Sequence, residues 1–235
     1  MNYSIHFMGD SAIIIHFEIK ADESFPLLQL IAKDIERQLG SIILEVVPAY
    51  QSITIHYTPS ILSHDRMAEL EEILKTMPRL NNHSTLSHSR KVIIPVCYDE
   101  EYAPDLQQLC HQLALSKEEF ISLHTRPVYS VHFIGFTPGF PFLIGLPPQL
   151  SASRKPNPRL KVKAGSVGIA GSQTGIYPED SPGGWQIIGR TPVPLFITSK
   201  SPPSYLCPGD TVVFTSISST EYKLKLNHLT TRNDT

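Results

Sequence analysis

The chain has 235 residues, of which 41% are hydrophobic and 18% are charged, a composition typical of a globular protein rather than a disordered one. Twenty basic residues oppose 22 acidic ones, and the formal net charge of −2 gives no basic surplus for binding nucleic acid. No apolar run approaches the ~20 residues that a membrane span needs. The N-terminal residues also lack the basic and apolar regions of a secretory signal. We therefore expect a cytoplasmic protein with no nucleic-acid or membrane partner.

The first 40 residues predict a hairpin followed by a helix. Residues 3–8 and 12–19 are apolar runs separated by a Gly9-Asp10 turn, which is typical of two antiparallel strands. Ser24 is placed to cap a helix, and Gly40 is placed to end it in a left-handed conformation. The apolar face of this helix would be Leu27, Leu28, Ile31, Ile35 and Leu39.

Residues 42–47 and 52–57 predict two more strands, the second with clean period-two alternation. Asp65 then opens a second predicted helix, with apolar positions at Met67, Leu70, Ile73, Leu74 and Met77. The order β-β-α-β-β-α predicts a small α+β domain over residues 1–80, with its helices on one face of an antiparallel sheet.

Residues 81–90 are polar, lack periodicity and are interpreted as a linker. His83 and His88 could bind a metal, but they have no carboxylate or cysteine partner nearby, which favours a solvated linker. The chain has three widely spaced cysteines, Cys97, Cys110 and Cys207. Their odd number and spacing predict neither a zinc site nor a disulfide framework. We expect no metal ligands.

The remaining residues, 91–235, begin with a predicted strand at 91–98 and a predicted helix at 103–115. Ser116 and Glu119 have the spacing of a capping box for a further helix at 117–125. After this helix, short apolar runs alternate with turns, as in a closed or sandwiched all-β unit. These runs are residues 129–136, 165–171, 185–191, 194–198 and 210–217.

Glycines 165, 168, 171 and 175 lie in a segment with no nucleotide-binding motif, since GxxxxGK[ST] and GxGxxG are both absent. Tight turns between barrel strands and a phosphate-binding nest both fit this spacing. No predicted helix follows directly to add its dipole, which favours the turns.

Residues 133–147 carry Phe136, Phe140 and Phe142 among prolines and glycines. Aromatic residues are more often core than pocket, but this punctuation prevents a regular element. We therefore expect some of the rings to form an apolar wall of a small-molecule site. His124 closes the preceding helix, where a histidine usually complements the helix dipole.

Arg159, Lys161 and Lys163 alternate along one predicted strand and would share a face. A solvated edge and an anion-binding site both fit this pattern. The adjacent Glu179 and Asp180 lie in a proline-flanked turn, which favours exposed carboxylates over an acid/base pair.

Five segments together resemble one known family. They are "PVCYDEEYAPDL" (95–106), "LHT" (123–125), "GFTPGFPFLIGLP" (135–147), "AGSVGIAGSQTGIYPEDSPGGWQIIGRTP" (164–192) and "PGDTVVF" (208–214). They resemble the family of the 5-oxoprolinase B subunit, which includes KipI-type histidine-kinase inhibitors and allophanate hydrolase subunit 1 domains. The likeness extends to "MGDSAIIIHFE" near the N-terminus and so covers nearly the whole chain.

This resemblance implies an α+β N-terminal domain followed by a cyclophilin-like β-barrel domain. It also implies that the chain is one subunit of an ATP-dependent 5-oxoprolinase complex, which hydrolyses 5-oxo-L-proline to L-glutamate. The other subunits would be A and C, and the chain would be inactive alone. ATP and Mg would be bound by, or shared with, a partner subunit. A five-membered lactam is a resonance-stabilised amide, so phosphorylating its oxygen would activate it. Such an enzyme needs cations near the developing phosphate charge and a base near water.

Carried over by position, the resemblance makes His124 and Arg159 the candidate catalytic residues, with His124 as the candidate base. The candidate substrate-binding residues, which include the aromatic wall, are Phe136, Phe140, Gln173, Tyr177, Ser181, Gly183, Gly184, Trp185 and Arg190.

Two alternatives stay open beside the enzyme subunit. A regulatory protein of this family would bind a sensor histidine kinase and inhibit its autophosphorylation, using an exposed apolar cleft in the β-domain around residues 136–142. A prolyl isomerase follows from the implied cyclophilin-like fold alone, and fold does not imply function.

Overall fold

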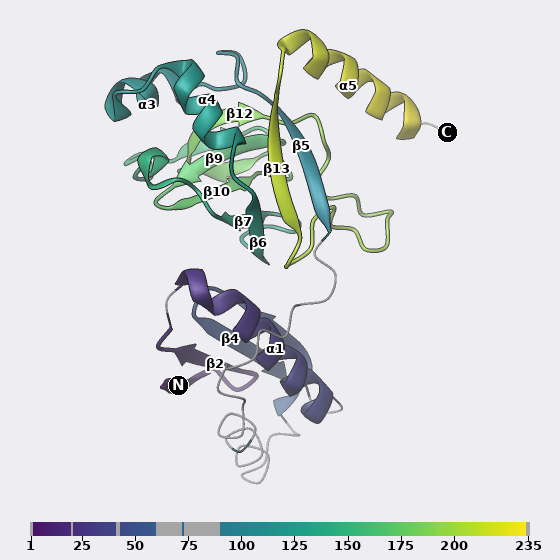
Figure 1. Cartoon of the computed structure of the whole chain (residues 1–235). Coiled ribbons are helices and arrows are strands. Elements are labelled where there is room, and N and C mark those ends of the chain that lie inside the picture. The colour runs from purple at the N-terminus through teal and green to yellow at the C-terminus, as the bar shows by residue number, and fades with distance from the viewer. Residues whose placement is uncertain (1, 20, 41–42, 60–71, 73–89, 234–235) are drawn as a thin grey trace. The chain divides into compact units, whose positions relative to one another are not determined.

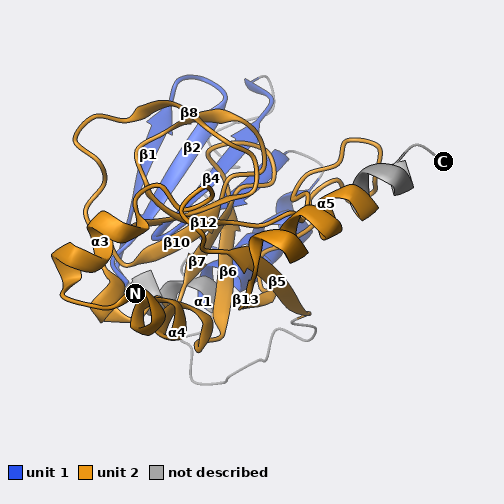
Figure 2. Cartoon of the chain, turned by 90° about the horizontal axis from the view of Figure 1, so that it is seen from above, with its two compact units in different colours: residues 1–87 blue, residues 88–235 orange. Residues whose placement is uncertain are grey.

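The structure, a computed structural model, describes residues 2–19, 21–40, 43–59, 72 and 90–233 (Figure 1). The chain divides into two compact units, Met1–Ser87 and His88–Thr235 (Figure 2). Among the described residues, no helix is both long and apolar enough to cross a membrane.

Unit 1 contains a four-stranded antiparallel sheet of order β1-β2-β4-β3 and one described helix. Its elements are β1 (Tyr3–Met8), β2 (Ala12–Phe17), α1 (Ala21–Leu39), β3 (Ile43–Pro48) and β4 (Ser52–Tyr57). Alternate residues of β4 are buried and pack with the apolar face of α1, as their periodicity predicts. The predicted second helix from Asp65 lies outside the described residues, so the six-element order β-β-α-β-β-α stays a prediction.

Two predictions about α1 are wrong. The helix begins at Ala21 rather than after Ser24. The φ angle of Gly40 lies outside the left-handed range. A Cβ at Gly40 would instead approach the carbonyl oxygen of Glu36 to 2.5 Å. The position therefore requires glycine because of this steric contact and not because of a left-handed backbone conformation.

Unit 2 is built on a closed seven-stranded barrel of order β10-β7-β6-β13-β5-β12-β9. Its strands are β5 (Lys91–Cys97), β6 (Tyr129–Ile134), β7 (Pro141–Ile144), β9 (Ser166–Ala170), β10 (Gln173–Ile176), β12 (Gln186–Arg190) and β13 (Thr211–Ile217). The first and last strands, β5 and β13, pair in parallel and lie side by side in Figure 1. The barrel confirms the predicted β-barrel, while its likeness to cyclophilin stays a prediction.

Helices and one small sheet surround this barrel. They are α3 (Leu106–Leu113), α4 (Lys117–Thr125), the short 3-10 helix η2 (Pro148–Leu150), α5 (Ser219–Asn233), and the paired strands β8 (Arg159–Val162) and β11 (Ser181–Gly183). The capping box of α4 is confirmed: the Ser116 hydroxyl accepts from the Glu119 N–H at 3.2 Å, and Glu119 accepts from the Ser116 N–H at 2.8 Å.

The sequence prediction is wrong in two other places in unit 2. Residues 194–198 do not form a strand, since only an isolated bridge joins Phe196 to Ser204. Helix α5 was not predicted, and a single buried residue anchors its first turns. The ring of that residue, Tyr222, lies 4.4 Å from the ring of Tyr102.

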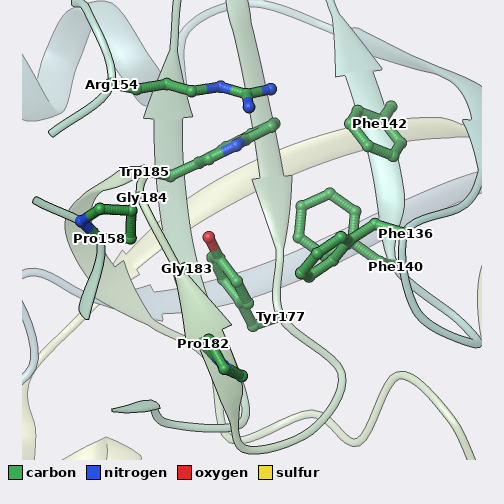
Figure 3. A pocket seen from close by; sticks show the side chains of 10 residues that line it. All are labelled: Phe136, Phe140, Phe142, Arg154, Pro158, Tyr177, Pro182, Gly183, Gly184 and Trp185. Carbon is green, nitrogen blue, oxygen red and sulfur yellow. The ribbon is translucent and has the colours of Figure 1, made fainter. Parts of the chain in front are cut away.

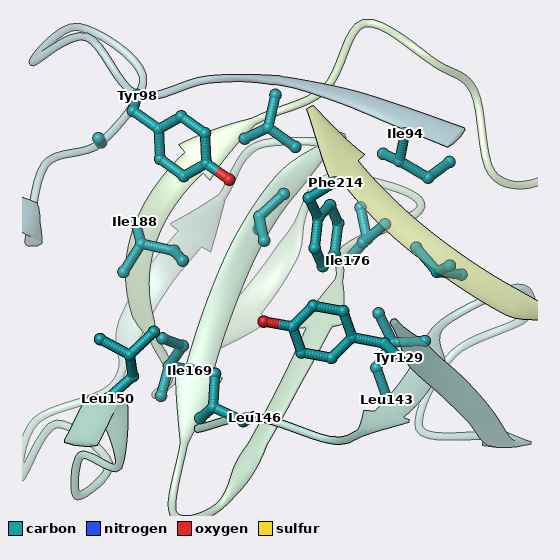
Figure 4. Close-up of a cluster of buried hydrophobic side chains, with 14 of the residues drawn as sticks. Ile94, Tyr98, Tyr129, Leu143, Leu146, Leu150, Ile169, Ile176, Ile188 and Phe214 are labelled. Atoms are coloured by element: carbon teal, nitrogen blue, oxygen red, sulfur yellow. The ribbon is translucent and has the colours of Figure 1, made fainter. Parts of the chain in front are cut away.

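The barrel interior is filled by buried side chains from every strand and from α3 and α4. Figure 4 shows Tyr98, Tyr129 and Phe214 pointing into this interior among aliphatic residues. The cysteines of unit 2 are all free thiols, two of them buried. The described residues contain no cluster of three or more metal-binding side chains.

Candidate functional site

A pocket of about 350 Å³ opens on unit 2, within the lower part of the range of ~300–1,000 Å³ typical of small-molecule sites. We call it the aromatic pocket. It is lined by Phe136, Phe140, Phe142, Arg154, Pro158, Tyr177, Pro182, Gly183, Gly184 and Trp185 (Figure 3). Six of the predicted site residues therefore come together here: Phe136, Phe140, Tyr177, Gly183, Gly184 and Trp185.

Two consecutive turns between β6 and β7 build one wall of the pocket. The Thr137 N–H donates to the Gly135 carbonyl at 2.8 Å around Phe136, whose φ is +67°, which makes a strained γ-turn. The Phe140 N–H then donates to the Thr137 carbonyl across Pro138 and Gly139, the latter with φ +82°. These turns hold the Phe136 ring out at the pocket rim, where the residue is 65% exposed.

Phe140 is the centre of the aromatic wall. Its ring makes edge-to-face contacts with Phe136, Tyr177 and Trp185, at centroid distances of 5.6, 5.2 and 5.4 Å. Such contacts stabilise one another beyond the area they bury. The wall is thus a rigid apolar surface with one exposed ring at its edge.

Three glycines make room for these rings, and they lie in strands. A Cβ at any of them would meet the side chain of a neighbouring aromatic residue at 3.0 Å or less, so each glycine lets that residue pack directly on the backbone. The contacts are Gly168 with Trp185 at 3.0 Å, Gly175 with Phe140 at 2.8 Å, and Gly183 with the Tyr177 hydroxyl.

The tight turns predicted for the glycine run occur at Gly165 and Gly171, with φ +79° and +59°. They are wrong for Gly168 and Gly175, which lie within β9 and β10. The spacing could not separate these two uses of glycine, because the aromatic partners come from distant segments.

The Tyr177 hydroxyl is the polar group at the inner end of the wall. Burial raises its pKa, and the hydrogen bond from the Trp185 backbone N–H offsets this shift. The positive charges of Arg154 and Arg159 also lower the pKa, which places both guanidiniums within electrostatic reach of the hydroxyl. Tyr177 is 1% exposed, so it supports the wall from behind the accessible surface of the pocket.

Arg154 is the functional candidate that the sequence prediction missed. It lines the pocket at the end opposite Pro182 in Figure 3. Its neighbours Lys155 and Arg159 instead turn to Asp105, at 2.9 and 2.6 Å. The prediction considered only cations that alternate along the strand, whereas Arg154 precedes that strand on a loop.

Arg159 does not line the pocket. Its Nη2 pairs with the buried Asp105, and its buried Nη1 has no hydrogen-bond partner. Burial alone would raise the pKa of Asp105, but Arg159, the Ile187 N–H and Lys155 together hold it below its usual value. Through Asp105, which also accepts from the Ile187 N–H of β12, Arg159 ties β8 to the barrel.

His124 is fully buried inside the barrel, so its predicted place at the pocket is wrong. Burial lowers the pKa of His124 to about 3, and the imidazole is therefore neutral. Its ring stacks on Phe214 at 4.6 Å. The Thr174 hydroxyl donates to the Gly168 carbonyl at 2.9 Å, so it accepts from His124 Nε2, and Nδ1 accepts from the Tyr98 hydroxyl at 2.8 Å.

The other predicted residues also lie outside the pocket lining. Gln173 and Ser181 each have one buried side-chain atom without a hydrogen-bond partner, as does Arg190 at Nε. The Arg190 guanidinium lies 5.9 Å from the centre of the Tyr102 ring, near the base of α5. These three residues are therefore not among those that line the aromatic pocket.

The alternating lysines form ion pairs rather than an open anion site. Lys161 and Lys163 approach Asp180 at 2.9 and 3.2 Å, and all three side chains are substantially exposed. Hydrogen bonds from Lys161 and from the Ala164 N–H hold the pKa of Asp180 well below its usual value. This geometry agrees with the solvated edge and with the exposed carboxylate that were predicted.

Comparison with known proteins places this geometry in a family. Residues 3–206 match the family described as carboxyltransferase domain, subdomain C and D. The 5-oxoprolinase B subunit of Bacillus subtilis (strain 168) is 39% identical over 241 residues, which cover 94% of this chain and 96% of that protein.

Solved structures share the fold. The structure of TTHA0988 is 37% identical with a TM-score of 0.74, covering 88% of this chain, which spans only 40% of that longer chain. The urea amidolyase of K. lactis, at 18% identity and a TM-score of 0.77, shows the same fold over 94% of this chain and 15% of its own. The chain therefore belongs to the family of the 5-oxoprolinase B subunit, within the carboxyltransferase-domain proteins.

Proposed function

We propose that this chain is one subunit of an ATP-dependent complex that hydrolyses 5-oxo-L-proline to L-glutamate, and that the aromatic pocket holds the lactam. One observation carries the proposal: a small aromatic-walled pocket in a chain that aligns over 94% of its length with a protein named as the B subunit of 5-oxoprolinase. A compact ring can lie against the exposed Phe136, behind which the buried Phe140, Tyr177 and Trp185 hold the wall in place.

The pocket supports the role of a partial site. Its lining residues include no carboxylate, imidazole or thiol, so they supply no general base to activate water. Hydrolysis at this pocket needs a base from elsewhere. We therefore propose that the chain is inactive alone and completes the site with the A and C subunits of the complex.

The glycine run of this chain does not support ATP binding at that segment. The glycine run forms turns at Gly165 and Gly171 and packs under aromatic rings elsewhere, so it offers no cradle for phosphates. When bound to the complex, ATP with Mg would supply activation of the lactam oxygen. We assign its binding to a partner subunit.

Reconstitution tests this proposal. The full chain, mixed with its two partner subunits, ATP and 5-oxo-L-proline, should release glutamate and ADP, and omission of any component should abolish this. Trp185→Ala should lower the rate at least about tenfold by removing one face of the pocket. The exposed Arg126→Ala is the matched control and should keep the wild-type rate. A complete complex that makes no ATP-dependent glutamate contradicts the proposed substrate.

A second candidate function, inhibition of a sensor histidine kinase, is favoured by the exposed Phe136 at the rim, which could enter an apolar groove of a partner. Autophosphorylation of candidate kinases should then fall when the chain is added and recover with Phe136→Ala. Undiminished phosphorylation in every case removes this candidate.

A further inference from the structure

The aromatic pocket presents one positive charge that no described residue neutralises. Arg154 lines it, and none of the ion pairs among the described residues includes this side chain. The residue is exposed, so its guanidinium can turn toward an anionic group of a ligand without first breaking an ion pair.

The cations around Arg154 are engaged elsewhere. Two acidic side chains bind four of them: Asp105 holds Lys155 and Arg159, and Asp180 holds Lys161 and Lys163. Each carboxylate thus faces two cations, and the segment keeps a surplus of positive charge that attracts anions. Of these cations, only Arg154 reaches the pocket lining.

We propose that the aromatic pocket selects compact rings that carry one carboxylate, and that Arg154 binds this carboxylate. The inference rests on the proposed function and names the group by which its substrate is recognised. The planar guanidinium matches a carboxylate through two parallel hydrogen bonds. The aromatic wall, whose exposed ring is Phe136, packs against the ring of the ligand, so different residues recognise the charge and the shape of the ligand.

Other ligand classes fit the pocket less well. A triphosphate needs several donors at once, whereas the lining offers one guanidinium. A cationic ligand would be attracted by the aromatic faces but repelled by Arg154. A ring without a carboxylate would leave the guanidinium unpaired.

The chain contains its own reporter for this test. Trp185 is the only tryptophan among 235 residues and lines the pocket, so its fluorescence follows occupancy. We would titrate the full chain at constant ionic strength with 5-oxo-L-proline, with its uncharged amide and with 2-pyrrolidinone, and repeat each titration by calorimetry. The carboxylate should bind at least about tenfold more tightly than the two uncharged rings.

Variants assign the effect to one side chain. Arg154→Ala should weaken 5-oxo-L-proline at least about tenfold while leaving 2-pyrrolidinone unchanged, and Arg154→Lys should restore part of the loss. Arg126→Ala removes an exposed arginine elsewhere in unit 2 and should bind like the wild type. Equal loss for both ligands, or no loss for either, overturns the inference.

Further probes separate this inference from the proposed function. If 5-oxo-L-proline does not bind but cyclopentanecarboxylate or benzoate does so through Arg154, the inference stands and the proposed substrate falls. If no ring carboxylate binds, or if inorganic phosphate or ATP binds more tightly through Arg154, the inference is overturned.

Discussion

Unit 2 contains two aromatic clusters that use the same residue types in opposite ways. In the barrel interior, His124 packs among Tyr98 and Phe214, is neutral, and has hydrogen-bond partners at both ring nitrogens. In the aromatic pocket, Phe136 is exposed on a strained turn and Arg154 has no ion-pair partner among the described residues. The comparison shows that exposed rings and charges without an ion-pair partner, rather than the number of aromatic residues, distinguish a binding surface from a core.

The largest effect on stability should come from removing the Asp105 carboxylate, which joins Lys155 and Arg159 to β12. Asp105 is buried and accepts from Lys155, Arg159 and the Ile187 N–H. Asp105→Ala leaves three partly buried donors without their acceptor and should lower the free energy of unfolding by about 3 kcal/mol. Urea denaturation measures this loss, and Asp105→Asn should lose less. A loss under about 1 kcal/mol, as for a surface ion pair, contradicts the anchoring role.

The neutral state of the interior cluster predicts a pH dependence. Because the folded pKa of His124 is about 3, below its ordinary value of 6.5, the unfolded chain binds a proton first as the pH falls. Stability is therefore fully present above about pH 6.5 and should fall below it by up to about 1.4 kcal/mol per pH unit.

The control is His124→Gln, which can still hydrogen-bond but cannot titrate. Urea unfolding at a series of pH values between about 7 and about 5 should give a shallower slope for this variant than for the wild type. Parallel profiles would show that His124 titrates in the folded protein as it does in the unfolded chain.

A smaller effect should reveal the strain at the pocket rim. Phe136→Gly and Phe136→Ala both remove the ring, but only glycine accepts φ +67° without strain. The glycine variant should therefore be about 1 kcal/mol more stable than the alanine variant, while both weaken ligand binding equally. Thermal unfolding and Trp185 fluorescence measure the two properties. Equal stability of the two variants argues against strain at this position.

The smallest effect is expected outside both clusters. Lys161 and Asp180 form an exposed ion pair, with 59% and 38% of their side-chain surfaces accessible. Lys161→Ala should leave the urea-denaturation midpoint and the ligand affinity indistinguishable from those of the wild type, because an exposed ion pair contributes little to stability. A marked loss of affinity would extend the anion site beyond Arg154.

Much of the fold followed from local patterns in the sequence. The strands around Gly9, the alternation of β4 and the capping box at Ser116 depend on neighbouring residues, and all three are confirmed. The exposed ring of the wall was also predictable, because the Pro-Gly punctuation after Phe136 places that residue in a loop; the expectation of no regular element is wrong for Phe142, which lies in β7.

The remainder depends on long-range contacts that local patterns do not carry. His124 has the sequence context of a helix end, yet α4 turns it into the barrel. Arg154 and Lys155 are adjacent cations in the sequence, but only Lys155 pairs with the distant Asp105. The use of Gly175 likewise depends on Phe140, which lies directly before β7 and is 35 positions away in the sequence.

The parallel pairing of β5 with β13 has a consequence for synthesis of the chain. Arg90 and Asp210, which directly precede these strands, form an ion pair across 120 residues of sequence. The barrel therefore cannot close until β13 has left the ribosome. Until then, the edge of β5 that pairs with β13 has no partner strand. A nascent chain that stops short of Thr211 exposes two open edges, so ribosome-bound intermediates of this protein should depend on chaperones until translation of unit 2 is nearly complete.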